Sequence, residues 1–88
     1  LVTSCEPCAM CYGAILWSGV RNVVCAARGS DAAAIGFDEA PKPKNWVTEL
    51  EKRGISVVRD MCRAEAKAVF RQYQESGGRI YNARKGLK

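Results

Sequence analysis

The hydrophobic positions of this chain follow two patterns, one typical of strands and one typical of helices, which take turns along the sequence. Residues 22–27 form a nearly continuous apolar run bounded by charged residues, which is typical of a strand covered on both faces, and residues 55–59 form a further predicted strand. Residues 62–73 instead carry apolar side chains every three or four positions, as on one face of a helix. The predicted order begins with a strand over 1–5, a helix over 7–18 and a strand over 22–27. A short helix follows, capped by Asn45 and ending at Arg53. The last elements are a strand over 55–59 and a helix that is capped by Asp60 and ends near Ser76.

Strands that alternate with helices predict an α/β fold. Because such connections are right-handed and join parallel strands, we expect a parallel sheet with helices covering it. Eighty-eight residues and three strands are few for an independent domain, and the first strand would present a bare edge. The chain also opens on Leu1 within an apparent strand, without an initiator Met. We therefore expect residues 1–88 to be a portion of one larger domain, with residues 76–88 as a tail.

The helix predicted over residues 7–18 is apolar almost all round. Such a helix is usually buried on two sides, so we expect one face on the sheet and the other against a partner. Leu16 and Trp17 would contact either another part of the protein or a second subunit, and plain core packing is the alternative. Cys25 and Cys62 lie within apolar patterns, so we expect both to be small core residues rather than ligands.

Residues 28–44 form a long connection that holds two glycines and two prolines. Long connections in compact domains are usually functional or disordered. This one contains an apolar segment, residues 34–37, that runs directly into two carboxylates, Asp38 and Glu39. We therefore expect an ordered connection that lies close to a site.

Composition and charge restrict the class of partner. Hydrophobic content of 48% is ordinary for a globular domain and excludes a disordered tail. The formal net charge is +5, yet most basic residues outside the last ten positions are interleaved with acids, and aromatic residues make up only 8% without a stacking run. Nucleic-acid binding is therefore not the expected function, although the basic tail keeps it open. A membrane-spanning role is not expected either, because no apolar run reaches the required length.

The chain holds five cysteines and no histidine. An odd number of cysteines, with spacing unlike that of a small secreted domain, favours a reducing compartment. We therefore expect the protein in the cytoplasm.

Cys8 and Cys11 form a C-x-x-C pair directly after Pro7. Proline fits the first position of a helix, and residues three apart leave the same face of its first turn. Free N–H groups and the helix dipole favour negative charge there, which lowers the pKa of a thiol. Such a pair is half of a metal site or a redox pair. Thioredoxin-like motifs tend to carry proline between the cysteines, whereas here it precedes the first, as in the P-C-x-x-C of zinc deaminases.

Several longer segments carry a family resemblance. Residues 4–15, followed by 17–18 and 20–21, resemble the zinc-binding half of the cytidine-deaminase-like superfamily. Residues 31–39, which contain G-F-D-E, resemble its guanine deaminase branch, and residues 78–84 resemble the ending of bacterial members of that branch. The resemblance implies a three-layer α/β/α fold of which this chain is the C-terminal part, without the N-terminal strands and the helix that carries an H-x-E motif.

The resemblance also implies a zinc site. In the superfamily one His and two Cys hold Zn²⁺, which activates water for attack on the ring carbon that carries the amino group, while the glutamate of H-x-E transfers protons. Cys8 and Cys11 match the two cysteine ligands. Since the chain has no His, it lacks the third ligand and that glutamate, and it should not catalyse the reaction alone. The complete protein is expected to be a zinc-dependent aminohydrolase.

For the guanine deaminase branch, the implied reaction converts guanine to xanthine and ammonia. Ring protonation and departure of ammonia both need a positioned acid, so Glu39 would be a second catalytic carboxylate, with Asp38 as the alternative or as a substrate contact. Tyr81 would close over the purine base, from the same chain or from the second subunit of a homodimer. The competing interpretation makes Asp38 and Glu39 solvated loop residues and Tyr81 a packing residue.

Other functions stay open on the sequence alone. They are a tRNA-adenosine, nucleoside or cytosine deaminase, a non-catalytic zinc-binding module, and a C-x-x-C redox domain. Activity on guanine would separate the deaminases, and zinc content against a reversible Cys8–Cys11 disulfide would separate the remaining classes.

Overall fold

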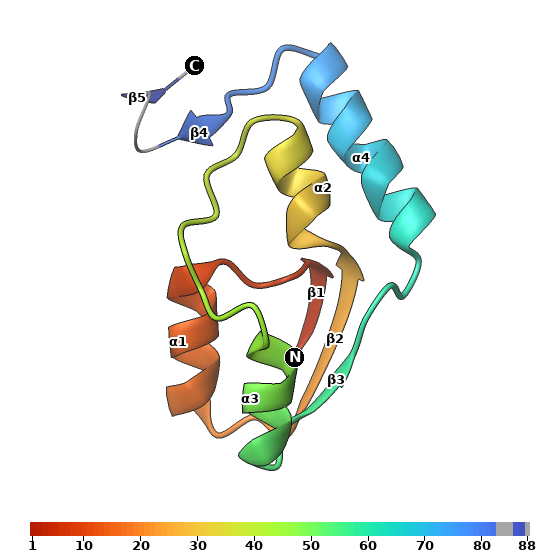
Figure 1. Ribbon diagram of the computed structural model, residues 1–88. Helices are drawn as coiled ribbons and strands as arrows, with labels where there is room; N and C mark the ends of the chain where they lie inside the picture. Colours follow the sequence, from red (N-terminus) through yellow and green to blue (C-terminus); the bar gives the residue numbers. More distant parts are fainter. Residues whose placement is uncertain (83–85, 88) are drawn as a thin grey trace.

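The computed structural model describes residues 1–82, 86 and 87, and its elements alternate between strands and helices (Figure 1). Strands β1 (Val2–Cys5), β2 (Asn22–Ala27) and β3 (Ser56–Val58) form a parallel sheet in the order β1-β2-β3. The helices are α1 (Ala9–Ser18), α2 (Gly29–Ala34), α3 (Trp46–Lys52) and α4 (Arg63–Glu75). Two short strands, β4 (Tyr81–Asn82) and β5 (Gly86–Leu87), pair antiparallel. The predicted parallel α/β arrangement is confirmed.

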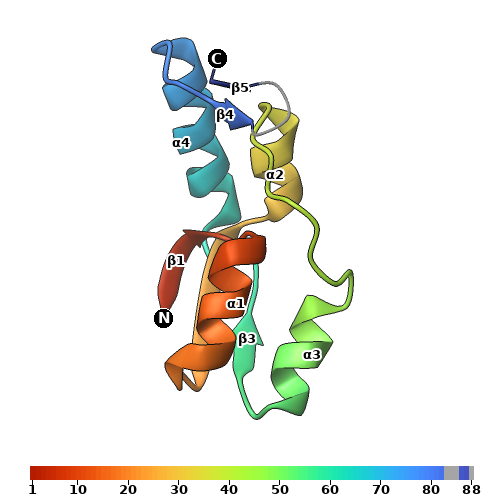
Figure 2. The same ribbon diagram turned by 90° about the vertical axis from the view of Figure 1, so that its left-hand side faces the viewer.

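The main core lies between the sheet and two helices. Helices α1 and α3 lie side by side against one face of the sheet (Figures 1 and 2). Burying side chains of this kind contributes about 1.5–3 kcal/mol each. The prediction that Cys25 is a core residue is confirmed, since none of its surface is exposed. The buried cluster consists of Ile15, Val23, Cys25, Trp46, Leu50 and Ile55.

Helix α1 begins two residues later than predicted, at Ala9, with Cys8 as its N-cap residue. It ends at Gly19, whose φ of 80° lies in the left-handed region that glycine adopts without strain. Ile15 faces the core, whereas Met10 and Trp17 are 79% and 92% exposed. Plain core packing is therefore wrong for Trp17, and its contact with a further partner stays a prediction.

Helices α2 and α4 lie beyond the carboxyl ends of β1 and β2 (Figure 1). The sequence did not predict α2, because its residues were assigned to an irregular connection. Its N-terminus is closed by Asp31, whose carboxylate accepts a hydrogen bond of 2.8 Å from the N–H of Arg28. A side chain that bonds back to the N-cap N–H stabilises the first turn of a helix, even of one this short.

The predicted core role of Cys62 is wrong. Asp60 and Cys62 both have left-handed backbone conformations, with φ of 63° and 56°, so the chain turns there and α4 begins at Arg63. Cys62 is exposed, and no residue of α4 is buried. The turn is held by a bidentate ion pair of 2.8 Å between Arg28 and Asp60, which periodicity alone did not reveal.

The predicted tail forms β4 and β5 in its described part. Ala83, Arg84, Lys85 and Lys88 lie outside the described residues, and with them fall most of the basic tail and the end of the segment that resembles bacterial guanine deaminases. Among the described residues, no helix has the length and hydrophobicity needed to cross a membrane.

Candidate active site

The centre of the candidate site is the turn between β1 and α1, which we call the thiol turn (residues 6–11). The chain leaves β1 at Cys5 and crosses the carboxyl end of the sheet, where the Glu6 N–H donates a hydrogen bond of 2.9 Å to the Ala27 carbonyl. Cys8 is the N-cap residue of α1, and its carbonyl accepts the N–H of Tyr12 at 2.8 Å. Cys11 therefore lies in the first turn of the helix, as predicted.

The thiols of Cys8 and Cys11 contact each other. The backbone N–H of Cys11 bonds to the Cys8 sulfur and lowers the pKa of Cys8, and the Cys11 thiol adds a second hydrogen bond. That thiol–thiol bond raises the pKa of Cys11, because Cys11 is the partner that keeps its proton. The helix start thus favours a thiolate at Cys8, with Cys11 directed toward it.

Glu39 lies beside this pair. The N–H of Ala9 donates a hydrogen bond of 3.1 Å to the Glu39 carbonyl, which ties the connection between α2 and α3 to the start of α1. Burial raises the pKa of the half-buried Glu39 carboxyl, while Lys42 opposes that shift. Burial and then the Glu39 charge raise the pKa of Cys5 to about 11. The structure therefore brings Glu39 together with the thiols.

Two surface hollows meet at Glu39. One, of about 330 Å³, is lined by the thiol turn, including Cys8 and Cys11. The other, of about 820 Å³, lies between residues 33–41 and β4. Glu39 lines both. A small molecule in the second hollow would therefore lie against the same carboxylate that faces the thiols.

Asp38 lies at the second hollow, whereas Tyr81 does not line it. Asp38 lines it, and its N–H donates a hydrogen bond of 3.4 Å to the Tyr81 carbonyl. The Tyr81 residue is 55% exposed, and the wall on the tail side is formed by the next residue, Asn82, whose amide donates 3.2 Å to the Gly36 carbonyl. Adjacent strand residues point to opposite faces, which is the sequence signal that would have found Asn82.

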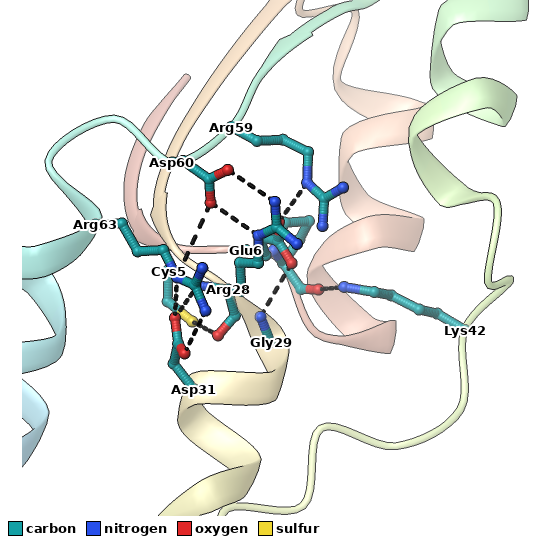
Figure 3. A network of polar contacts seen from close by, with 10 residues as sticks. Cys5, Glu6, Arg28, Gly29, Asp31, Lys42, Arg59, Asp60 and Arg63 are labelled. Carbon is teal, nitrogen blue, oxygen red and sulfur yellow. Dashed lines mark hydrogen bonds and ion pairs between the residues drawn. The ribbon is translucent and has the colours of Figure 1, made fainter.

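A polar cluster behind the thiol turn was also missed (Figure 3). Glu6 is only 6% exposed, and its carboxylate accepts hydrogen bonds from the Gly29 N–H at 3.0 Å and from Arg59 at 2.6 Å. The ammonium of Lys42 donates to the carbonyl of Pro7. An acidic residue directly before P-C-x-x-C was visible in the sequence, but its partners come from residues 23 to 53 positions away.

The donors present suit part of a zinc site. Zinc is bound in proteins by thiolates, and a metal would replace the proton that Cys8 and Cys11 share. Among the described residues, no group of three His, Cys, Asp or Glu side chains could hold a metal ion, and the whole chain has no His. The two cysteines fit as two ligands of a site whose third ligand this chain does not supply.

The fold and the thiol turn define a class: a parallel α/β unit with a C-x-x-C pair at the start of its first helix. No protein-family model matches the chain. Over 55 residues it is 55% identical to the guanine deaminase of Bacillus subtilis strain 168, a match that covers 62% of this chain and 35% of that protein. A shorter match, 67% identical over 24 residues, covers 27% of this chain and 15% of a Schizosaccharomyces pombe protein named "Probable cytosine deaminase".

Solved structures of guanine deaminase are similar to this chain as well. A structure of guanine deaminase from Nitrosomonas europaea is 57% identical with a TM-score of 0.82, covering 84% of this chain and 41% of that one. A Nitrosomonas variant solved in complex with 8-azaguanine is 54% identical with a TM-score of 0.84, covering 86% of this chain and 42% of that one. The resemblance to guanine deaminases is confirmed over the part of those proteins, less than half of their length, that this chain spans.

Proposed function

We propose that the complete protein to which this chain corresponds is a zinc-dependent aminohydrolase that converts guanine to xanthine and ammonia. One observation carries the proposal: the thiols of Cys8 and Cys11 meet at the start of α1, beside Glu39, in a chain similar to guanine deaminases. The 8-azaguanine bound to a neighbour of 54% identity supports a purine base as the substrate. A His ligand and a proton-transferring Glu would come from outside this chain.

Each residue of the site then has a task. Cys8 and Cys11 would donate their sulfurs to zinc, and the N–H groups of the helix start stabilise the thiolate form. When bound, zinc would supply the electrophile that activates water at neutral pH. Glu39 would hold a proton beside the purine ring for the departing ammonia. Asp38 and the tail segment at Tyr81 would border the purine in the larger hollow.

The exposed apolar face of α1 supports a further part of the proposal. Met10 and Trp17 are mostly exposed, which favours contact with the rest of the protein or with the second subunit of a homodimer. All five cysteines lie in the described part of the chain and are free thiols, which fits a reducing compartment such as the cytoplasm.

The deciding experiment uses the complete protein, purified and assayed for ammonia release. Guanine, cytosine, adenosine and an adenosine-containing tRNA stem-loop are the substrates, and zinc content is measured by mass spectrometry. We expect one zinc per chain and turnover of guanine above the other three. Turnover of cytosine or the stem-loop alone would replace guanine with that substrate. A zinc-free protein with a reversible Cys8–Cys11 disulfide would instead establish the redox function.

A further inference from the structure

The thiol turn contains a buried carboxylate that the proposed chemistry does not use. Glu6 stands two positions before Cys8, and its side chain is 5% exposed. A buried charge is costly unless it is paired and hydrogen-bonded. Both oxygens of Glu6 are satisfied, one by the Gly29 N–H and one by Arg59 (Figure 3). The carboxylate therefore links three segments: the thiol turn, the start of α2 and the residues that follow β3.

Pro7, the next residue of the thiol turn, is held by a different cation. The carbonyl of Pro7 accepts a hydrogen bond from Lys42, which belongs to the same connection as Glu39. The Lys42 ammonium lies 4.5 Å from the ring centre of buried Trp46, and the Arg59 guanidinium lies 5.7 Å from the same ring. One aromatic ring thus orients the two cations that hold Glu6 and Pro7.

These side-chain contacts matter because the other hydrogen bonds that hold the thiol turn are made by its backbone, from Glu6 to Ala27 and from Ala9 to Glu39. Cys8, the N-cap residue of α1, makes no side-chain hydrogen bond that caps the helix. Metal ligands need to be held within about 0.5 Å of their bound geometry, and residues that orient ligands typically change metal affinity about 10–100-fold when they are replaced. Only one residue, Pro7, separates Glu6 from Cys8, and its ring restricts φ. A shift of Glu6 is therefore transmitted to the first thiol.

We infer that Glu6, paired with Arg59, is a positioning residue that sets the geometry of the Cys8–Cys11 pair for metal binding. Glu6 touches neither the metal nor the substrate and acts through the backbone of the thiol turn. The inference rests on the proposed function, because the metal it serves is the one proposed there.

The chain provides a matched control. Asp31 is a carboxylate with 8% side-chain exposure, paired with Arg63 at 2.9 Å, and both Arg59 and Arg63 have 36% side-chain exposure. The Asp31 pair joins α2 to α4 and makes no contact with the thiol turn among the described interactions. Glu6→Gln and Asp31→Asn therefore remove equivalent charges, and only the first lies at the thiol turn.

The experiment compares these variants in the complete protein. Zinc affinity is measured by competition with a chromophoric chelator, and stability by thermal unfolding of the metal-free protein. We expect Glu6→Gln to weaken zinc binding about tenfold and Asp31→Asn to weaken it less than about twofold, although both lower the melting temperature. Arg59→Gln should weaken zinc binding as Glu6→Gln does, and the double variant should be no weaker than either. Equal zinc affinity in Glu6→Gln and Asp31→Asn, whether both unchanged or both reduced, overturns the inference.

Hydrogen exchange of the metal-free protein separates this inference from the proposed function. We expect faster exchange across residues 8–12 in Glu6→Gln and no change there in Asp31→Asn. If the wild type holds no zinc, the proposed function fails, and exchange alone then decides whether Glu6 orders the thiol turn. If the wild type holds zinc and deaminates guanine while Glu6→Gln behaves as Asp31→Asn does, only the inference about Glu6 fails.

Discussion

The molecule contains two regions that are held together in different ways. The sheet region, made of β1–β3 with α1 and α3, is stabilised by apolar burial around Leu50 and Val23, which expose 0% and 1% of their surface. The upper region, made of α2, α4 and β4, has no buried residue in α4, and ion pairs hold its helices in place. Asp31–Arg63 joins α2 to α4, and Arg28–Asp60 joins the residue before α2 to the turn before α4.

The candidate site lies where these two regions meet. Cys8 and Cys11 belong to the sheet region, whereas Asn82 belongs to the upper region and Glu39 to the connection between them. A metal requires fixed ligands, and a well-packed scaffold provides them. A substrate has to enter and leave, which suits groups carried by less buried segments. The contrast predicts that changes in the two regions will affect different properties of the protein.

The largest expected effect comes from the connection between the regions. In the complete protein, Glu39→Gln should lower kcat by about 10²–10⁴-fold if the carboxyl transfers a proton, since general acids contribute about that much. The melting temperature should change little, because the Ala9–Glu39 hydrogen bond uses the backbone carbonyl, which Gln retains. Steady-state kinetics and thermal unfolding check both expectations. Asp38→Asn tests the alternative carboxylate: a larger loss of turnover there than in Glu39→Gln would assign the proton transfer to Asp38, and unchanged turnover in Glu39→Gln would remove the catalytic role of Glu39.

The next effect concerns stability. Leu50→Ala in the sheet region should lower the free energy of unfolding by about 2–5 kcal/mol, because it leaves a cavity in a closed core. Val69→Ala on α4 should change it by no more than about 0.5 kcal/mol, because Val69 is 62% exposed. Denaturant unfolding of the complete protein measures both. A comparable loss in the two variants would mean that α4 is covered in the complete protein and that the contrast between the regions does not hold there.

These regions also differ in how well the sequence predicts them. The nearly continuous apolar run at 22–27 identified β2, which is buried at alternate positions, and the segment 55–59 identified β3, although β3 has no buried residue. Pro7 with C-x-x-C located the start of α1 to within two residues. In the upper region, periodicity placed Cys62 in a core that α4 does not form. The conformation there depends on left-handed turns at Asp60 and Cys62 and on ion pairs between distant residues.

The residues of the candidate site also differ in how well the sequence predicts them. Cys8 and Cys11 were proposed from their spacing after Pro7, and Glu39 from its place after an apolar segment and from the family resemblance, and their roles stay predictions. Glu6 was adjacent to the motif, yet its role depends on Arg59, which is far away in the sequence. No local pattern predicts which distant cation neutralises a buried carboxylate, so these residues required the structure.

A smaller effect tests, through pH, the ion pair that joins α2 to α4 within the upper region. The Arg63 guanidinium, together with the Arg28 N–H, holds the pKa of Asp31 well below its usual range. A lowered pKa in the folded state means that the carboxylate stabilises the fold above the unfolded pKa of about 3.9, and that this contribution is lost as the pH falls below it. Asp31→Asn should therefore melt below the wild type at pH 7, and the difference should shrink below about pH 4. A difference that is constant with pH would show that the ionised form of Asp31 does not hold the helices together.

The smallest expected effect lies at the end of the described chain. Truncation after Gly78 removes the Asn82 amide, which bonds the Gly36 carbonyl, and the Tyr81 carbonyl, which accepts the Asp38 N–H. If the loosened wall of the hollow weakens the bound purine by about 1 kcal/mol, the typical value of one hydrogen bond, KM for guanine should rise about fivefold while kcat stays near the wild type. Two single variants locate the effect, because adjacent strand residues face opposite ways: Asn82→Ala removes the hollow's wall, and Tyr81→Ala removes the exposed ring. A raised KM in Tyr81→Ala supports closure of that ring over the purine, and a raised KM in Asn82→Ala alone assigns the contact to Asn82. An unchanged KM in the truncated protein leaves the tail with a packing role only.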